Sequence, residues 1–156
     1  MPKITVLLVE DHHVVRKGIS YLLSLEEDID IVGEAEDGNE GIKMAKELCP
    51  DVVIMDITMP NLNGIDAIKK ISKSMPETKV MIMTMHTREQ YIRQALRDGA
   101  SGYLLKETTQ DELVDAIRTV HKGGVALSPS ISRFVLNEYV RHSDPKRDVD
   151  SIELLT

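Results

Sequence analysis

Five polar side chains follow short apolar runs of the sequence, each at a position where a β-strand would end. They are three carboxylates, one hydroxyl and one ammonium group, namely Glu10, Asp11, Asp56, Thr84 and Lys106. In an open parallel sheet, ligands bind beyond the carboxyl ends of the strands, beside the point where the strand order reverses. If the runs are parallel strands, these side chains lie together on one edge of the sheet and form a candidate reactive site.

A cluster of acids needs a positive partner. Two carboxylates about 5 Å apart repel each other by roughly 3 kcal/mol at an effective dielectric constant near 20. Three such pairs cost on the order of 10 kcal/mol, which is comparable to the whole stability of a domain. Protonation or a hard divalent cation must relieve this repulsion, and Mg²⁺ suits the case because it prefers oxygen ligands and keeps several waters.

A carboxylate beside Mg²⁺ and an ammonium group predicts phosphoryl transfer. One carboxylate would attack an incoming phosphoryl group and form an aspartyl-phosphate. That reaction depends mainly on in-line positioning and on neutralising the phosphoryl oxygens. We expect Mg²⁺ and Lys106 to neutralise these oxygens and Thr84 to donate a hydrogen bond to one of them.

The elements that position these side chains alternate between strands and helices. Apolar runs predict five strands, at residues 4–9, 29–35, 52–55, 80–83 and 102–105. Segments of helical period follow them, at residues 13–25, 39–48, 63–73, 88–98 and 110–121. Five strand–helix units at this spacing indicate a doubly wound, flavodoxin-like α/β fold with a parallel sheet of order 2-1-3-4-5 and helices on both faces.

The character of the sequence changes after Gly124. Ser128 and Pro129 offer a capping hydroxyl and a first-turn proline, so we expect a C-terminal linker helix at 128–140. Residues 141–150 are polar and charged, which is typical of a flexible linker, and the residues after them turn apolar again. We therefore divide the chain into a main domain, a linker helix with its flexible linker, and the start of a further domain, at residues 1–124, 125–150 and 151–156.

The overall composition argues against several classes of protein. The chain has a net charge of −7 and no basic stripe, so it is a poor candidate for binding nucleic acid alone. No apolar run approaches the length needed to span a membrane, and Met1 leads almost directly into the first strand, which predicts no signal peptide. The single cysteine, Cys49, fits a reducing cytoplasm, and we expect its side chain to be buried at a helix end.

Short motifs surround the polar residues, namely Glu10-Asp11, Met55-Asp56-Ile57-Thr58-Met59-Pro60, Gly64, Thr84 and Tyr103-Leu104-Leu105-Lys106. Together they resemble the response-regulator receiver domains of two-component systems, over residues 3 to about 122. The segments 56–64, 83–86 and 99–103 are similar to the NarL/FixJ-type subfamily, whose members carry a LuxR-type helix-turn-helix domain. The resemblance therefore implies both a receiver domain and a longer regulator of which that domain is one part.

This resemblance implies a role for each residue of the site. Asp56 accepts a phosphoryl group from a sensor histidine kinase, and Lys106 contacts that group. Asp11, Asp56 and the backbone carbonyl of Thr58 hold Mg²⁺, while Glu10 acts on the metal through water. Such a domain is a phosphoacceptor switch rather than an enzyme, since it catalyses only its own phosphotransfer and dephosphorylation.

The resemblance also implies how phosphorylation is read out. Thr84 and Tyr103 form a switch pair that changes protein contacts. The expected partners are the kinase, a second copy of the phosphorylated chain, and DNA only through a C-terminal helix-turn-helix domain that begins at 151–156; no membrane partner is expected. The whole protein would then be a transcription regulator, and the alternative is a stand-alone single-domain regulator that acts through protein–protein contacts.

Three other interpretations of the same residues compete at this point. Asp11 and Asp56 could each be a helix N-cap, since aspartate is common at strand-to-helix junctions. A metal-dependent phosphatase with an aspartyl intermediate would need a second acid, as in Asp-x-Asp, and Asp56-Ile57-Thr58 lacks it. A flavodoxin-like cofactor binder would need a phosphate loop rich in Ser, Thr and Gly, whereas Glu10-Asp11 would repel a phosphate.

Overall fold

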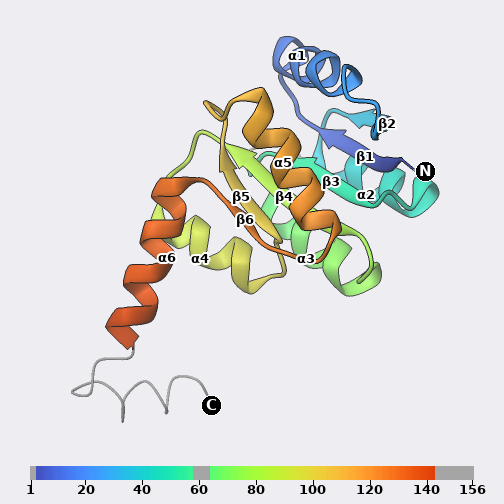
Figure 1. Cartoon of the computed structure of the whole chain (residues 1–156). Coiled ribbons are helices and arrows are strands. Elements are labelled where there is room, and N and C mark those ends of the chain that lie inside the picture. Colours follow the sequence, from blue (N-terminus) through green and yellow to red (C-terminus); the bar gives the residue numbers. More distant parts are fainter. Residues whose placement is uncertain (1–2, 58–63, 143–156) are drawn as a thin grey trace.

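Parallel strands form one sheet at the centre of the structure (Figure 1). They are β1 (Ile4–Val9), β2 (Ile29–Ala35), β3 (Val52–Met55), β4 (Lys79–Thr84), β5 (Gly102–Leu105) and β6 (Ala126–Leu127). Their spatial order is β2-β1-β3-β4-β5-β6, and every neighbouring pair is parallel, which confirms the predicted doubly wound fold. This computed structural model describes residues 3–57 and 64–142. Three expectations therefore fall outside the described residues: the ligand Thr58, the expected linker beyond residue 142, and the start of a further domain at 151–156.

The helices begin and end within two residues of their predicted ranges. They are α1 (His13–Ser24), α2 (Gly38–Leu48), α3 (Gly64–Ser74), α4 (Glu89–Arg97), α5 (Gln110–His121) and α6 (Pro129–His142). The end of α5 is followed by Gly123 with a φ of 93°, a left-handed conformation that glycine adopts without a steric penalty. No helix in the described part of the chain is both long and apolar enough to cross a membrane.

Two hydrophobic cores lie on opposite faces of the sheet. Successive side chains of a strand point to opposite faces, so a central strand supplies both cores. Val53 and Met55 join the core beneath α2, α3 and α4, whereas Val52 and Ile54 join the core beneath α1 and α5. All four are at most 1% exposed. This burial explains why β3 is continuously apolar, and it places the residue after β3 at the middle of the sheet edge.

The prediction of five strands is incomplete, because Ala126–Leu127 adds β6 beside β5. The backbone N–H of Ala126 donates to the Ser101 carbonyl, and that of Ser128 donates to the Tyr103 carbonyl. A strand of two residues is too short to show an alternating pattern, so the sequence carries no periodic signal for it. The chain then enters α6, whose Ile131 is 2% exposed in the core that also contains α4. Residues 126–127 therefore belong to the sheet, and the start of α6 packs against the core through Ile131.

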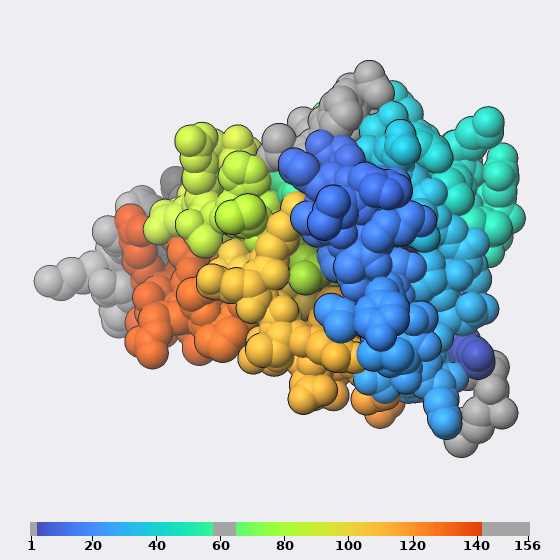
Figure 2. All heavy atoms as spheres, turned by 90° about the horizontal axis from the view of Figure 1, so that it is seen from above, coloured from blue at the N-terminus to red at the C-terminus, as the bar shows by residue number. Residues whose placement is uncertain are grey.

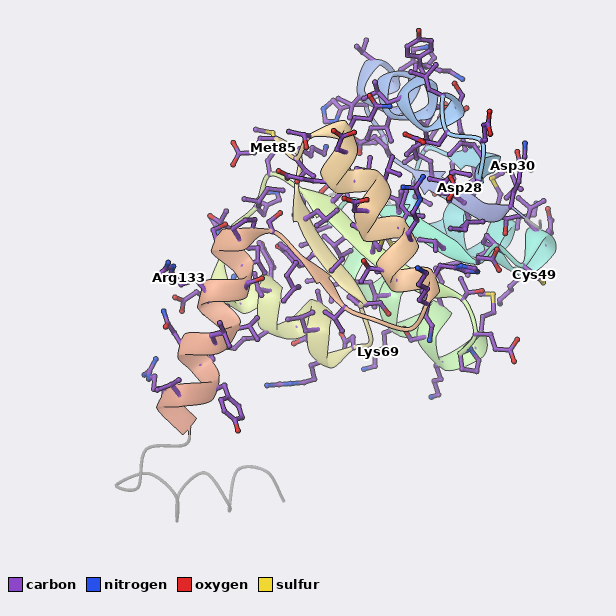
Figure 3. All side chains as sticks on the ribbon, in the orientation of Figure 1. Asp28, Asp30, Cys49, Lys69, Met85 and Arg133 are labelled. Carbon is purple, nitrogen blue, oxygen red and sulfur yellow. The ribbon has the colours of Figure 1, made fainter. Side chains whose placement is uncertain are left out.

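The prediction of a buried Cys49 is wrong. Cys49 follows the last turn of α2 with a φ of 47°, and its side chain is exposed, near the outer end of that helix in Figure 3. A left-handed residue at a helix end turns the chain sharply away from the helix axis. Here the turn brings Pro50, rather than Cys49, into a buried position.

Candidate functional site

Three strand ends meet at the side chain of Lys106, which follows β5. Its Nζ lies 2.6 Å from Oε1 of Glu10, after β1, and 2.8 Å from Oδ2 of Asp56, after β3. Glu10 is 2% exposed and Asp56 is 7% exposed, so the two carboxylates and the ammonium group form a largely buried cluster. In Figure 2, seen from above, the blue, lime and gold atoms, which include those after β1, β4 and β5, adjoin one another near the middle of the face in view.

Asp11 lies at the rim of this cluster. Its carboxylate Oδ1 is 3.3 Å from Nδ1 of His12, and the ligand atoms of Glu10, Asp11 and His12 all lie within 4.8 Å of one another. The residue that caps α1 is His12 rather than Asp11, and its side chain makes no capping hydrogen bond. Asp11 therefore does not serve as the N-cap of α1 and instead belongs to the acidic group.

The acidic group fits a divalent cation. Glu10 Oε2 and Asp11 Oδ1 are shielded from solvent, and neither accepts a hydrogen bond from the residues that the structure describes. Buried oxygens in that position are costly unless a donor or a cation satisfies them. When ionised, Glu10, Asp11, Asp56 and Lys106 sum to a charge of −2, which one Mg²⁺ would balance. The ligand atoms are carboxylate oxygens, which Mg²⁺ prefers.

The electrostatics of Lys106 and Glu10 follow from their contact. Burial by itself lowers the pKa of the Lys106 ammonium, but its hydrogen bonds to Asp56 and Glu10 outweigh that effect, so the pKa is raised. Burial raises the pKa of the Glu10 carboxyl, Lys106 lowers it again in part, and the charges of Asp56 and Asp11 add to the rise. Lys106 is therefore cationic at neutral pH, and the Glu10 carboxyl resists ionisation more than a carboxyl in water does.

Thr84 and Tyr103 are joined through the backbone of His86. Thr84 is fully buried, and its Oγ1 accepts the N–H of His86 at 3.2 Å. Tyr103 is fully buried as well, and its hydroxyl donates to the His86 carbonyl at 2.9 Å. Burial, together with the charge of Asp56, raises the pKa of the Tyr103 phenol, which keeps it a neutral donor. The Lys106 N–H donates to the Thr84 carbonyl at 2.9 Å, so this pair adjoins the acidic cluster.

Ser128 connects this edge to α6. Its hydroxyl accepts the N–H of Leu105 at 3.0 Å, while its own N–H donates to the Tyr103 carbonyl at 3.1 Å. The sequence predicted a hydroxyl at a helix start, which is a local pattern. That the hydroxyl binds β5, 23 residues earlier in the chain, follows only from the position of β6.

Arg16 is a residue of this edge that no strand-end pattern predicts. It is 6% exposed on the same face of α1 as Ile19 and Leu23, and its Nη1 donates to the Glu10 carbonyl at 2.7 Å. The available signal was an arginine on the apolar face of a helix, since arginine is seldom buried without a partner.

Comparison with known proteins identifies the family. Residues 6–118 match the response regulator receiver domain. The chain is 42% identical over 143 residues to the transcriptional regulatory protein LnrK of Bacillus subtilis, covering 92% of this chain and 65% of LnrK. It is 40% identical over 154 residues to the oxygen regulatory protein NreC of Staphylococcus haemolyticus, covering 97% of this chain and 71% of NreC. The chain thus spans about two thirds of the length of these relatives.

Solved structures agree with this match. A LuxR-family two-component response regulator from Aurantimonas sp. superposes with a TM-score of 0.83 at 35% identity, covering 88% of this chain and 99% of that one. The signal receiver domain of the putative response regulator NarL from Mycobacterium tuberculosis gives a TM-score of 0.77 at 33% identity, covering 79% and 99%. The chain therefore belongs to the response-regulator receiver domains of two-component systems, in the NarL/LuxR-type group.

Proposed function

We propose that Asp56 is the phosphoacceptor of this receiver domain and that a sensor histidine kinase supplies the phosphoryl group in a Mg²⁺-dependent reaction. The observation that carries the proposal is the contact of Lys106 Nζ with Asp56 Oδ2 at 2.8 Å, within a group that contains two further carboxylates. An oxygen of Asp56 attacks phosphorus while the bond from phosphorus to the kinase histidine breaks, and the electron pair of that bond stays on the histidine nitrogen.

The remaining residues have distinct tasks in this proposal. Glu10, Asp11, Asp56 and the carbonyl of Thr58 would hold Mg²⁺, with Glu10 acting through water. Bound Mg²⁺ would supply charge neutralisation for the phosphoryl oxygens. Lys106 would be the protein cation beside those oxygens, and its raised pKa keeps it charged before the transfer.

The signal would leave the site through Thr84. Its hydroxyl already accepts the His86 N–H, and a hydroxyl can donate its own proton to a phosphoryl oxygen. A shift of Thr84 toward that oxygen would move the His86 peptide, to which the Tyr103 hydroxyl is also bonded. Thr84→Ala should therefore leave phosphorylation intact and weaken the association of two phosphorylated copies, measured by sedimentation. Normal association in Thr84→Ala would rule out the hydroxyl as the coupling group.

Intact mass measurement tests the assignment of Asp56 as the phosphoacceptor. Acetyl phosphate with Mg²⁺ should add one phosphoryl group, about 80 Da, in a linkage that hydroxylamine cleaves, as for an acyl phosphate. Asp56→Asn should abolish the addition. The matched control is Asp51→Asn, because Asp51 stands at the opposite end of β3 and its Oδ2 accepts the N–H of Thr5 at 3.0 Å. Equal modification of Asp56→Asn and the parent protein would refute the assignment.

The longer relatives support a proposal about the whole protein. LnrK extends beyond the matched region by about a third of its length and is named a transcriptional regulatory protein. We infer that a helix-turn-helix domain follows the expected linker at 141–150, and that phosphorylation controls its binding to DNA. The acidic chain alone should show no specific mobility shift at about 0.1 M salt, since it offers few phosphate contacts. A version extended to the length of LnrK should bind DNA, and more tightly when phosphorylated.

A further inference from the structure

The guanidinium of Arg16 is buried between α1 and the ends of two strands. Its Nη1 donates to the Glu10 carbonyl at 2.7 Å, and its Nε lies 3.3 Å from Oε1 of Glu34 on β2. Its Nη2 lies 3.2 Å from Nδ1 of His13 and 3.7 Å from Oε1 of Glu36. An arginine held on this many sides has little conformational freedom, because a backbone carbonyl and an imidazole nitrogen bind its planar fork and two carboxylates lie beside it.

The contact fixes the turn that carries the acidic group. The Glu10 N–H donates to the Ala35 carbonyl on β2 at 3.0 Å, and the Glu10 carbonyl is taken by Arg16. Both backbone polar groups of Glu10 are thus bound, while its side chain reaches Lys106. The N–H of Arg16 also donates to the His12 carbonyl at 2.9 Å, which closes the first turn of α1 on its cap residue, next to Asp11.

We propose that Arg16 is a positioning residue that holds the Glu10–Asp11 turn in the geometry required to bind Mg²⁺. The inference rests on the proposed function only in that the acidic group is taken to bind Mg²⁺. Mg²⁺ tolerates little departure from octahedral geometry, so a turn that moves presents its oxygens poorly. Residues that orient metal ligands typically change metal affinity by 10–100-fold when replaced. For Arg16 we expect the half-saturating Mg²⁺ concentration to rise about tenfold.

The sign of the change in Mg²⁺ affinity on replacing Arg16 distinguishes a positioning role from a purely electrostatic one. Arg16 is a cation beside an acidic metal site, so by Coulomb's law alone its removal would make Mg²⁺ bind more tightly. Positioning predicts the opposite, because the freed Glu10 carbonyl lets the turn move. A purely structural role would lower the melting temperature and leave Mg²⁺ affinity unchanged in the folded protein.

The experiment is a titration of the whole chain with Mg²⁺ alone, without a phosphoryl donor. The NMR amide shifts of Asp11 and Asp56 monitor binding, at a temperature well below the melting temperature. Arg16→Lys keeps the charge but lacks the planar fork, and Arg16→Met removes both. The matched control is Arg118→Lys, because Arg118 also bonds two carboxylates, of Asp28 and Glu26, yet touches no residue of the acidic group.

The proposal predicts that both Arg16 variants need about tenfold more Mg²⁺ for half-saturation, whereas Arg118→Lys has the same midpoint as the parent. It also predicts that the Asp11 amide exchanges faster with solvent in metal-free Arg16→Lys. An unchanged Mg²⁺ midpoint in Arg16→Lys, or tighter binding in Arg16→Met, overturns it. Should Arg16→Met fail to fold, Arg16→Lys alone decides. A parent protein that shows no Mg²⁺ response overturns the proposed metal site together with the inference, whereas a normal parent response with normal variants overturns the inference alone.

Discussion

Lys106→Met should destabilise the metal-free protein in a strongly pH-dependent way. Lys106 Nζ lies 2.6 Å from Glu10 and 2.8 Å from Asp56, and each contact is a gross attraction of about 6 kcal/mol at an effective dielectric constant near 20. Most of this attraction offsets the cost of removing three charges from water. Removing one partner of a buried pair still costs about 3–5 kcal/mol, because the other partner stays buried without its opposite charge.

Protonation of Glu10 sets a limit on this loss. The carboxyl can take up a proton instead of remaining charged. Protonating a carboxyl above its ordinary pKa of 4.5 costs about 1.4 kcal/mol per pH unit, so at pH 7 it costs roughly 3.5 kcal/mol. We therefore expect Lys106→Met to lose about 3 kcal/mol at pH 7. For a domain of this size that lowers the melting temperature by roughly 10 °C.

The pH dependence follows from the raised pKa of Glu10. Burial raises this pKa in the folded protein, Lys106 partly counters the rise, and the variant loses that counterweight. An acid whose folded pKa lies above its unfolded value favours the folded state below the unfolded pKa, and this contribution is lost as pH rises through the folded pKa. The variant should therefore approach the parent near pH 4 and fall furthest below it at pH 7.

Urea unfolding followed by circular dichroism at pH 4 and pH 7, without Mg²⁺, measures both effects. The control is Lys17→Met, because Lys17 makes an exposed ion pair with Glu34 at 3.3 Å. Such exposed pairs contribute about 0.5 kcal/mol. The reasoning is refuted if Lys106→Met loses as much stability at pH 4 as at pH 7, or no more than Lys17→Met does.

Three further outcomes are expected. Asp11→Ala should raise the melting temperature of the metal-free protein by relieving charge repulsion and should remove most of the increase that millimolar Mg²⁺ produces; an undiminished Mg²⁺ response would exclude Asp11 as a ligand. Gly99→Ala should cost about 1–3 kcal/mol in urea unfolding, because Gly99 has a φ of 112° and an added Cβ would lie 2.5 Å from Oγ of Ser72. Gly18→Ala, within α1 and with nothing within 4 Å of the added Cβ, should instead stabilise by about 0.5–1 kcal/mol, and equal effects would contradict this contrast. Phe134→Ala removes a partly buried ring that packs α6 against the core, so hydrogen exchange should quicken along α6 first; uniform quickening would mean that α6 does not open by itself.

The sequence alone determined the order of the first five strands and the six helices, and the residues at those strand ends. Both are local properties, since the period of apolar residues depends on neighbours within a few positions. The run from Val52 to Met55 indicated a central strand because a parallel strand covered on both faces is continuously apolar. Asp56 and Thr84 could therefore be placed at the carboxyl edge of the sheet without coordinates.

The tertiary structure decided which groups touch there. Glu10 and Lys106 are 96 residues apart in the sequence and 2.6 Å apart in space, and no periodic pattern encodes that choice of partner. The position of Arg16 on the apolar face of α1 indicates burial but no partner, and only the packing of α1 on the sheet brings its guanidinium to the Glu10 carbonyl. The two residues of β6 likewise pair only because β5 presents an open edge. Side-chain contacts across the fold depend on packing angles and rotamers, which the local pattern does not contain.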